Sequence, residues 1–248
     1  MVHSLMLKFS DYSVPDFEFD MSYDERRANG ARYSSVGTSA YGWGGGIWRD
    51  PDLMPKSGYQ TKRGRVPDVF PMPASNAVSQ RFKDLVEEFE PGVHQFFPLA
   101  LRDKNGVPLP DPYYIFNCRT RLDAVLVAES GLSWRSEKIP EGRPVSSMSF
   151  GSQLVFSRPA IAGHHLWFGD YLWQHGKIYV SDAFYTELKA RKIRFFEIKQ
   201  YPELDIPWIA EEQIKPMLDW EASHEPKAWY SNTRSKIEVH EYRARLGL

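Results

Sequence analysis

The sequence predicts an α+β fold: a mixed or antiparallel sheet of short strands, a few packed helices and a long loop excursion near the N-terminus. Three observations lead to this prediction. A strongly amphipathic helical pattern covers residues 76–90, a hairpin pattern follows it directly, and one β-α-β pattern covers residues 177–198. Because strands and helices do not alternate regularly along the chain, a doubly wound parallel sheet is not expected.

The N-terminal part of the chain predicts little regular structure apart from one short strand. Residues 17–19 alternate apolar and acidic side chains, which is typical of a strand. Glycine and proline punctuate residues 29–75 densely, and this predicts a loop. Because disordered segments are poor in aromatic residues, Trp43 and Trp48 indicate that the excursion packs onto the main body.

Residues 76–90 carry the clearest helical pattern in the sequence. Apolar side chains at i, i+4, i+7 and i+8 spacing are expected to share one face: Val78, Phe82, Leu85, Val86 and Phe89. Ser75 or Asn76 is expected to cap the first turn. Pro91-Gly92 is expected to end the helix.

A hairpin is predicted directly after this helix. Residues 93–101 form its first strand, residues 113–118 return as its second, and residues 103–106 (Asp-Lys-Asn-Gly) form a turn between them. Residues 119–130 fit neither the helical nor the strand period. Residues 131–152 are rich in serine, glycine and proline, which predicts a loop.

The next part of the chain predicts short strands around one helix. Strands are expected at residues 154–156, 165–168 and 177–180. A helix is expected from Ser181 to about Arg191, followed by a closing strand over residues 193–198. The tail then changes sign: residues 203–225 hold seven acidic side chains and one basic side chain, and residues 226–248 are basic on balance.

Composition excludes several classes of protein. A net charge of −1 and a pI of about 6.7 lack the basic excess of nucleic-acid-binding proteins. The single cysteine, Cys118, excludes an intrachain disulfide and fits a reducing compartment. The apolar run at the N-terminus is too short for a signal peptide, and no stretch has the length of a transmembrane helix. We therefore expect a soluble cytoplasmic protein that neither binds nucleic acid nor spans a membrane.

The aromatic content, 15% with eight tryptophans, fits two interpretations. Aromatic side chains suit strands, so the surplus fits a β-rich core. Tryptophan, tyrosine and arginine are also enriched at the hot spots of protein interfaces, so it fits a binding face. Composition alone favours the core.

Four residues that could bind a metal lie within twelve positions: His164, His165, Asp170 and His175. Adjacent histidines on a strand point to opposite faces, so only one of the first pair could join a site. Zinc sites need three or four ligands at defined spacing, and neither a cysteine pair nor a His-Glu-x-x-His motif is present. We expect no metal site.

Cys118 and His94 are a conceivable nucleophile and base on neighbouring strands. A lone cysteine at the end of an apolar strand is more typical of a small buried residue, and no catalytic motif surrounds it. The glycines of residues 42–46 lack the spacing of a phosphate-binding loop. We therefore expect neither catalytic residues nor a cofactor.

The acidic stretch also contains Trp208 and Trp220. An acidic patch with embedded aromatic residues suits a basic protein partner, because opposite charge speeds encounter and buried aromatic rings hold the complex. A solvated helix face explains the pattern more simply, since Glu211, Glu212 and Lys215 have helical spacing.

Several segments have a distinctive order and spacing: Glu90 to Leu99, Tyr113 to Cys118, Asp123-Ala124, Glu129-Ser130, Ile178 to Asp182 and Arg191 to Ile198. Together they resemble a bacterial immunity-protein family, numbered eleven among the immunity families of polymorphic toxins and first catalogued as a domain of unknown function. The resemblance covers residues 76–200. Its residues are largely apolar or turn-forming, so they are interpreted as determinants of the fold.

The resemblance implies a cytoplasmic protein encoded beside a secreted toxin, which binds the toxin domain and protects the producing cell. It brings no catalytic residue and no cofactor. We therefore expect one immunity-protein-like domain over residues 1–248. Residues 76–200 would be its core, and residues 1–75 and 201–248 its elaborations.

The contacts with the toxin are predicted from aromatic and acidic character. We expect Trp43, Trp48 and Arg49 from the aromatic loop, and Trp208, Glu211 and Glu212 from the acidic stretch. The alternative function is a hydrolase that reverses the toxin's modification or acts on a small molecule. It would use His94, Cys118 or His165. A third option is a structural or adaptor protein without a toxin.

Overall fold

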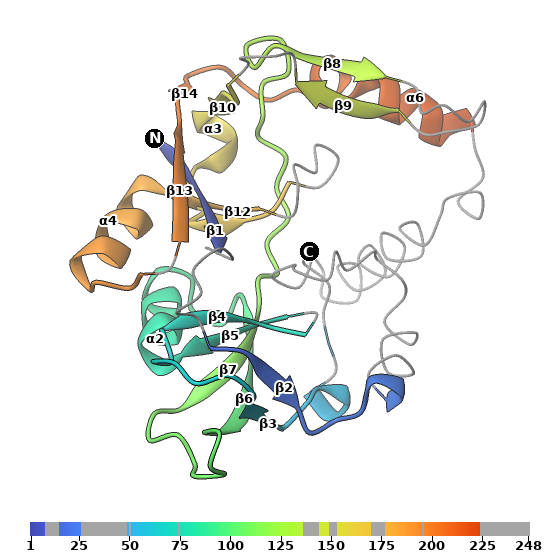
Figure 1. The fold of residues 1–248 in the computed structure, drawn as a ribbon. Helices are drawn as coiled ribbons and strands as arrows, with labels where there is room; N and C mark the ends of the chain where they lie inside the picture. The colour runs from blue at the N-terminus through green and yellow to red at the C-terminus, as the bar shows by residue number, and fades with distance from the viewer. Residues whose placement is uncertain are drawn as a thin grey trace.

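The computed structural model describes residues 1–7, 15–25, 49, 51–73, 75–135, 144–148, 153–169, 177–194 and 196–223. These residues form a six-stranded sheet, a four-stranded sheet and two smaller strand pairs, with short helices packed around them (Figure 1). The strands are short and the pairing is mixed, so the predicted α+β class is confirmed.

The six-stranded sheet has the order β2-β3-β6-β7-β5-β4. Its strands are β2 (Phe17–Phe19), β3 (Ser57–Gln60), β4 (Val69–Met72), β5 (Ser75–Ser79), β6 (Gln95–Arg102) and β7 (Tyr113–Asn117). Neighbouring strands are antiparallel, except that β3 and β6 are parallel. The sheet curls until its edge strands β2 and β4 meet, with the rings of Phe17 and Phe70 4.7 Å apart. A buried apolar cluster that includes Phe97 and Leu99 fills the concave side.

Strands β3 and β4 correct the prediction of an irregular segment over residues 29–75. Glycine and proline suggested a loop, but each has a role in a strand. A Cβ on Gly58 would lie 2.5 Å from the carbonyl oxygen of Glu18, so the close approach of β2 and β3 requires glycine there. Pro71 lies in β4, an edge strand, where a missing N–H is tolerated.

The predicted hairpin is confirmed as β6 and β7, which pair antiparallel from Gln95–Asn117 to Leu99–Tyr113. The predicted turn is also present. The N–H of Gly106 donates to the carbonyl of Asp103, and Gly106 has a φ of 83°, a left-handed conformation that glycine adopts without strain.

The helix predicted over residues 76–90 is shorter than expected. Helix α2 is Gln80–Phe89, and its cap is Ser79, not Ser75 or Asn76. The hydroxyl of Ser79 accepts a hydrogen bond from the N–H of Phe82. Residues 75–79 instead form β5, which pairs with β4 and β7 on its two sides. These two ladders outweigh the helical propensity of the segment.

The four-stranded sheet has the order β11-β12-β1-β13, and all neighbours are antiparallel. Its strands are β11 (Leu166–Trp167), β12 (Ile178–Ser181), β1 (Val2–Leu7) and β13 (Phe196–Tyr201). Helix α4 (Asp182–Ala190), capped by Ser181, joins β12 to β13 as predicted. The N-terminal strand β1 lies between these two strands, a position that the sequence did not indicate.

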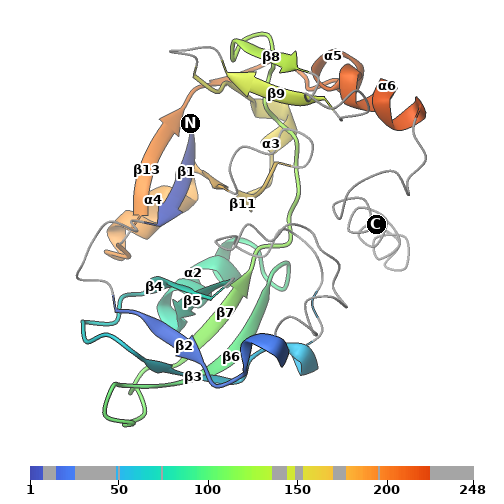
Figure 2. The same ribbon diagram turned by 45° about the vertical axis from the view of Figure 1, so that its right-hand side comes forward.

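Helix α2 lies between the two sheets and joins their cores (Figures 1 and 2). Phe82, Leu85 and Val86 are fully buried on one face of this helix. They pack in one cluster with Phe116 of β7, Val180 of β12 and Phe184 of α4. The apolar face predicted for this helix is therefore the central packing surface of the fold.

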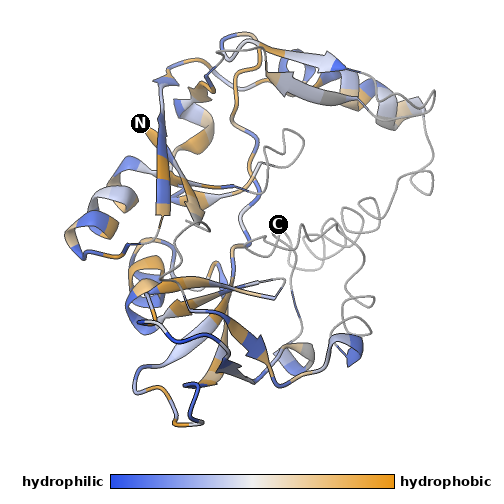
Figure 3. Cartoon of the chain, in the orientation of Figure 1, coloured by the Kyte–Doolittle hydropathy of each residue, from blue (hydrophilic) through white to orange (hydrophobic). Residues whose placement is uncertain are grey.

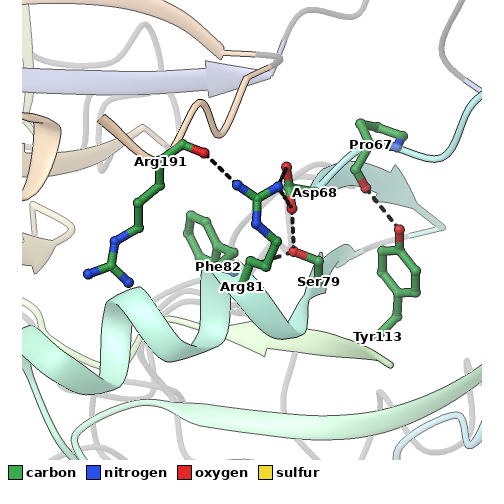
Figure 4. Close-up of polar contacts among 7 residues, drawn as sticks. All are labelled: Pro67, Asp68, Ser79, Arg81, Phe82, Tyr113 and Arg191. Atoms are coloured by element: carbon green, nitrogen blue, oxygen red, sulfur yellow. Dashed lines mark hydrogen bonds and ion pairs between the residues drawn. The ribbon is translucent and has the colours of Figure 1, made fainter. Parts of the chain in front are cut away.

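Polar contacts hold the ends of α2 and α4 together (Figure 4). Arg81 donates to the carbonyl oxygen of Arg191 at 2.5 Å and pairs with the carboxylate of Asp68 at 3.3 Å. Arg191 in turn pairs with Glu88. Asp68 also accepts from the hydroxyl of Ser79 at 2.7 Å, so the cap of α2 belongs to the same network.

The remaining elements lie around the two sheets (Figure 2). They are η1 (Pro51–Leu53) near the curled sheet, the hairpin β8 (Leu132–Arg135) and β9 (Val145–Met148), the pair β10 (Phe156–Ser157) and β14 (Glu203–Leu204), and the helices α3 (Arg158–Ile161), α5 (Ala210–Gln213) and α6 (Lys215–Ser223). The hairpin corrects the loop predicted over residues 131–152. No helix in the described part of the chain is long and apolar enough to cross a lipid bilayer.

Candidate functional site

His94, a candidate base, lies in a buried polar network between the two sheets. Its Nδ1 accepts a hydrogen bond from the N–H of Arg119 at 3.1 Å, so the proton is on Nε2, which donates to Glu90 at 2.5 Å. The other carboxylate oxygen of Glu90 accepts from the N–H of His165 at 2.6 Å and the N–H of Leu166 at 3.3 Å. Both ring nitrogens of His94 are therefore engaged in holding the fold.

Cys118, the candidate nucleophile, is fully buried in the cluster around α2. Burial raises the pKa of its thiol well above the ordinary value, and the negative charge of Glu90 acts in the same direction. The thiolate, which is the reactive form, is therefore disfavoured. The position fits the small buried residue that the strand pattern suggested.

His165, the third candidate catalytic group, also has structural contacts. The hydroxyl of Ser181, which caps α4, lies 2.8 Å from His165 Nδ1, and the ring of Phe89 packs edge-on against the imidazole. The neighbouring His164 is half-buried, whereas Asp170 and His175 lie outside the described residues. Within the described residues, no group of three or more metal-ligating side chains is found.

A shallow depression of about 400 Å³ lies beside α4. It is lined by His3, Asp182, Tyr185, Thr186, Lys189 and Gln200. His3 pairs through Nε2 with Asp182 at 2.8 Å, and this hydrogen bond holds the pKa of Asp182 below its ordinary value. The other ring nitrogen of His3 is buried, so it does not face the depression. Asp182, by contrast, is exposed and lines the depression.

Trp208, a predicted partner contact, is half-buried against the apolar cluster of the four-stranded sheet. Its indole N–H donates to the carbonyl oxygen of Val125 at 3.1 Å. Five residues further on, Gln213 is buried and accepts from the N–H of Val127 at 2.6 Å. Trp208 therefore anchors residues 202–212 to the main body. We refer to residues 202–212 as the strap.

The two acidic candidates and the arginine are placed differently. Glu211 and Glu212 lie in α5 with exposed side chains. Arg49 is half-buried beside β6, where Gln95 bonds both its N–H and its carbonyl oxygen at 2.9 Å. Trp43 and Trp48 lie outside the described residues. The structure thus describes one candidate surface, the strap with α5, and it lies far along the chain from Arg49.

Sequence reasoning did not single out the exposed apolar side chains of the strap. Leu204, Ile206 and Ile209 each expose more than a third of their surface. The one available signal was the alternation of acidic and apolar residues between Pro202 and Pro207. Such a pattern is typical of a half-buried strand, so it did not by itself predict that Leu204 and Ile206 are exposed.

The family model described as "Immunity protein family (Imm11)" matches residues 18–201. This range covers well over half of the 248 residues. It contains all of residues 76–200 and begins 58 residues before them, so β3, β4 and all but the first residue of β2 are included. No curated protein matches the chain.

Proposed function

The chain belongs to the immunity protein family Imm11, and we propose that it neutralises one cognate bacterial toxin by binding the toxin domain directly. The family match carries this proposal, because it covers almost all of the six-stranded sheet, helix α2 and every strand of the four-stranded sheet except β1. An immunity function needs a protein partner. The proposed partner is the toxin domain encoded beside the gene, and the proposed place of binding is the cytoplasm of the producing cell.

Three side chains bear on the choice between a binding protein and a hydrolase. His94 uses both ring nitrogens in backbone and carboxylate contacts, Cys118 is fully buried, and His165 bonds the cap of α4. The hydrolase alternative relies on at least one of these three groups facing its substrate. The positions of these groups support a binding function over the hydrolase alternative.

The test is protection from the toxin at defined stoichiometry. The neighbouring toxin domain is expressed in a sensitive host with and without this protein, and growth is followed. The purified toxin is then titrated with the purified protein. We expect restored growth and inhibition that is complete at an equimolar amount. Inhibition at a small fraction of that amount, or a change in the toxin's mass, would favour the hydrolase, and absence of protection would refute the proposal.

The predicted contacts are part of this proposal. Alanine substitution tests each predicted contact in the same titration. The substituted residues are Trp43, Trp48 and Arg49 of the aromatic loop, and Trp208, Glu211 and Glu212 of the acidic stretch. A true contact is expected to weaken binding by more than ~1 kcal/mol while the folded state is retained. Because Trp208 has a structural bond, its variant needs a separate measurement of stability.

A further inference from the structure

The strap exposes three large apolar side chains. Leu204 is 39% exposed, Ile206 36% and Ile209 43%, within six residues of one another. Exposed apolar side chains scattered singly need no explanation, but neighbouring ones mark an interaction surface. Met1, 44% exposed, lies next to this row, because its amino group pairs with Glu203 at 2.7 Å.

Hydrogen bonds to the main body hold the strap in place. Glu203 and Leu204 form β14, which pairs parallel with β10, and the hydroxyl of Ser157 donates to the carbonyl of Ile206 at 2.5 Å. The indole of Trp208 is tied to Val125. An interface formed by a preorganised segment loses less conformational entropy on binding than one formed by a mobile loop. The exposed row is therefore built as a fixed surface.

The charge around this row is acidic. Asp205, Glu211 and Glu212 are exposed, and none has an ion-pair partner within the part of the chain that the structure describes. Glu203, by contrast, is half-buried and pairs with the amino group of Met1 and with Arg158. Figure 3 shows mixed hydrophilic and hydrophobic residues continuing along α6, where Met217 is buried and Asp219 exposed. An apolar row with an acidic rim complements a partner that presents lysine or arginine around an apolar pocket.

We propose that the strap is the surface that docks onto the toxin, with Leu204, Ile206 and Ile209 as apolar anchors and Asp205, Glu211 and Glu212 as the charged rim. The partner face is basic with an apolar centre. This inference rests on the proposed function and adds to it the location and chemistry of the interface. Trp208 supports the strap from its inner side.

The test measures association and dissociation rates with the purified toxin domain encoded beside the gene. Ile209→Asp is expected to raise the dissociation rate by about tenfold or more, because it places a charge in the apolar centre. Val107→Asp is the matched control, since Val107 is 58% exposed in the loop between β6 and β7, away from the strap. That control is expected to change neither rate.

Reversing the charge of two side chains tests the role of the charged rim. The pair Glu211→Lys and Glu212→Lys is expected to lower the association rate several-fold at low salt and to weaken its dependence on ionic strength. Asp84→Lys, an exposed position on α2, is the control and is expected to leave the rate unchanged. The inference is overturned if Ile209→Asp and the pair Glu211→Lys and Glu212→Lys both leave the association and dissociation rates at the wild-type values.

A second measurement does not depend on any variant. Hydrogen exchange of the wild-type chain is compared with and without the toxin domain, and we expect slower exchange over residues 202–212. Unchanged exchange there, with protection elsewhere, would overturn the inference while leaving the proposed function intact. If the wild type fails to bind or protect at all, the proposed function itself fails. If Ile209→Asp only separates a homodimer and leaves toxin affinity unchanged, a second copy occupies the strap and the inference is wrong.

Discussion

The Nε2–H of His94 donates a hydrogen bond to the carboxylate of Glu90 at 2.5 Å, and both side chains are buried. Through this carboxylate, the end of α2 is bonded to the start of β6 and, by the N–H of His165, to the start of β11. One side chain thus connects both sheets and the helix between them. A buried carboxylate stabilises a fold only when a partner compensates its charge. The pair of Glu90 and His94 is therefore tested first.

Glu90→Gln is expected to lower the free energy of unfolding by about 1–3 kcal/mol at neutral pH, because Glu90 accepts hydrogen bonds through both carboxylate oxygens, whereas the amide has only one accepting oxygen. Burial acts to raise the pKa of Glu90, but the hydrogen bonds from His94 and His165 outweigh it and hold the pKa below 4.5. Since the folded pKa is the lower one, this stability is present above the unfolded pKa and is lost as pH falls through the folded value.

Urea unfolding of both proteins, followed by tryptophan fluorescence at neutral pH and between about pH 5 and 3, measures this dependence. The difference between wild type and Glu90→Gln should be largest at neutral pH and should shrink as the carboxylate is protonated. Glu18→Gln, on the exposed side of β2, is the control and should show no such trend. A difference that stays constant over the acid range would contradict the assigned role of Glu90.

The sequence predicted those elements whose signals are local. Helix α4 was predicted because Ser181-Asp182 and the apolar spacing of Phe184 and Leu188 lie within one segment. Strand β1 was not predicted to be central, because its partners β12 and β13 lie far along the chain. Strand β5 was assigned to a helix because Val78 and Phe82 have helical spacing, and only its two neighbouring strands decide otherwise.

The candidate surface was predicted in part for the same reason. Glu211 and Glu212 are exposed, as expected of polar side chains. Trp208 was chosen for its aromatic character, but its hydrogen-bond partner, Val125, lies 83 residues away, so its half-buried position could not be read locally. Whether Leu204 and Ile206 are exposed depends on the segments that lie against the strap, such as β10. These segments are distant in the sequence.

Trp208→Ala is expected to lower the free energy of unfolding by roughly 2–4 kcal/mol, because it removes a large half-buried ring and the bond to Val125. Trp208→Phe should lower it less, since most of the ring contacts remain. Ile209→Ala, at an exposed position, should change it by less than ~0.5 kcal/mol. Thermal unfolding of the three variants shows whether their losses of stability follow this order. If Trp208→Ala leaves stability unchanged and abolishes toxin binding, Trp208 is a direct contact.

Ser79→Ala is expected to lower the free energy of unfolding by about 1–2 kcal/mol. The substitution removes the acceptor for the N–H of Phe82 and the donor to Asp68, two of the bonds drawn in Figure 4. Ser79→Thr keeps both groups and should recover most of the loss. Denaturant midpoints of the two variants provide the comparison. Equal midpoints for wild type and Ser79→Ala would show that α2 does not depend on this cap.

Cys118 is expected to react with thiol reagents only when the protein unfolds. Burial raises the pKa of its thiol, and the reactive thiolate is therefore scarce as well as inaccessible. Labelling at neutral pH should be slow in the native protein and should accelerate with urea in parallel with loss of structure. Glu129→Cys in a Cys118→Ala background, at an exposed position, is the fast-reacting control. Rapid labelling of native Cys118 would show an accessible thiol and reopen the hydrolase alternative.

Lys192→Gly is expected to raise the free energy of unfolding by about 0.5–1 kcal/mol, an increase without any new contact. Lys192 has a φ of 56°, a left-handed conformation that strains a residue with a Cβ. Lys192 follows α4, and its N–H bonds the carbonyl oxygen of Lys189. The N–H of the next residue, Ile193, bonds the carbonyl oxygen of Leu188. In this arrangement glycine is preferred at the position of Lys192. Lys192→Ala keeps the Cβ and should give no gain. Urea unfolding of both variants tests this, and an equal or larger gain from alanine would mean that the lysine side chain, not the backbone, is unfavourable at this position.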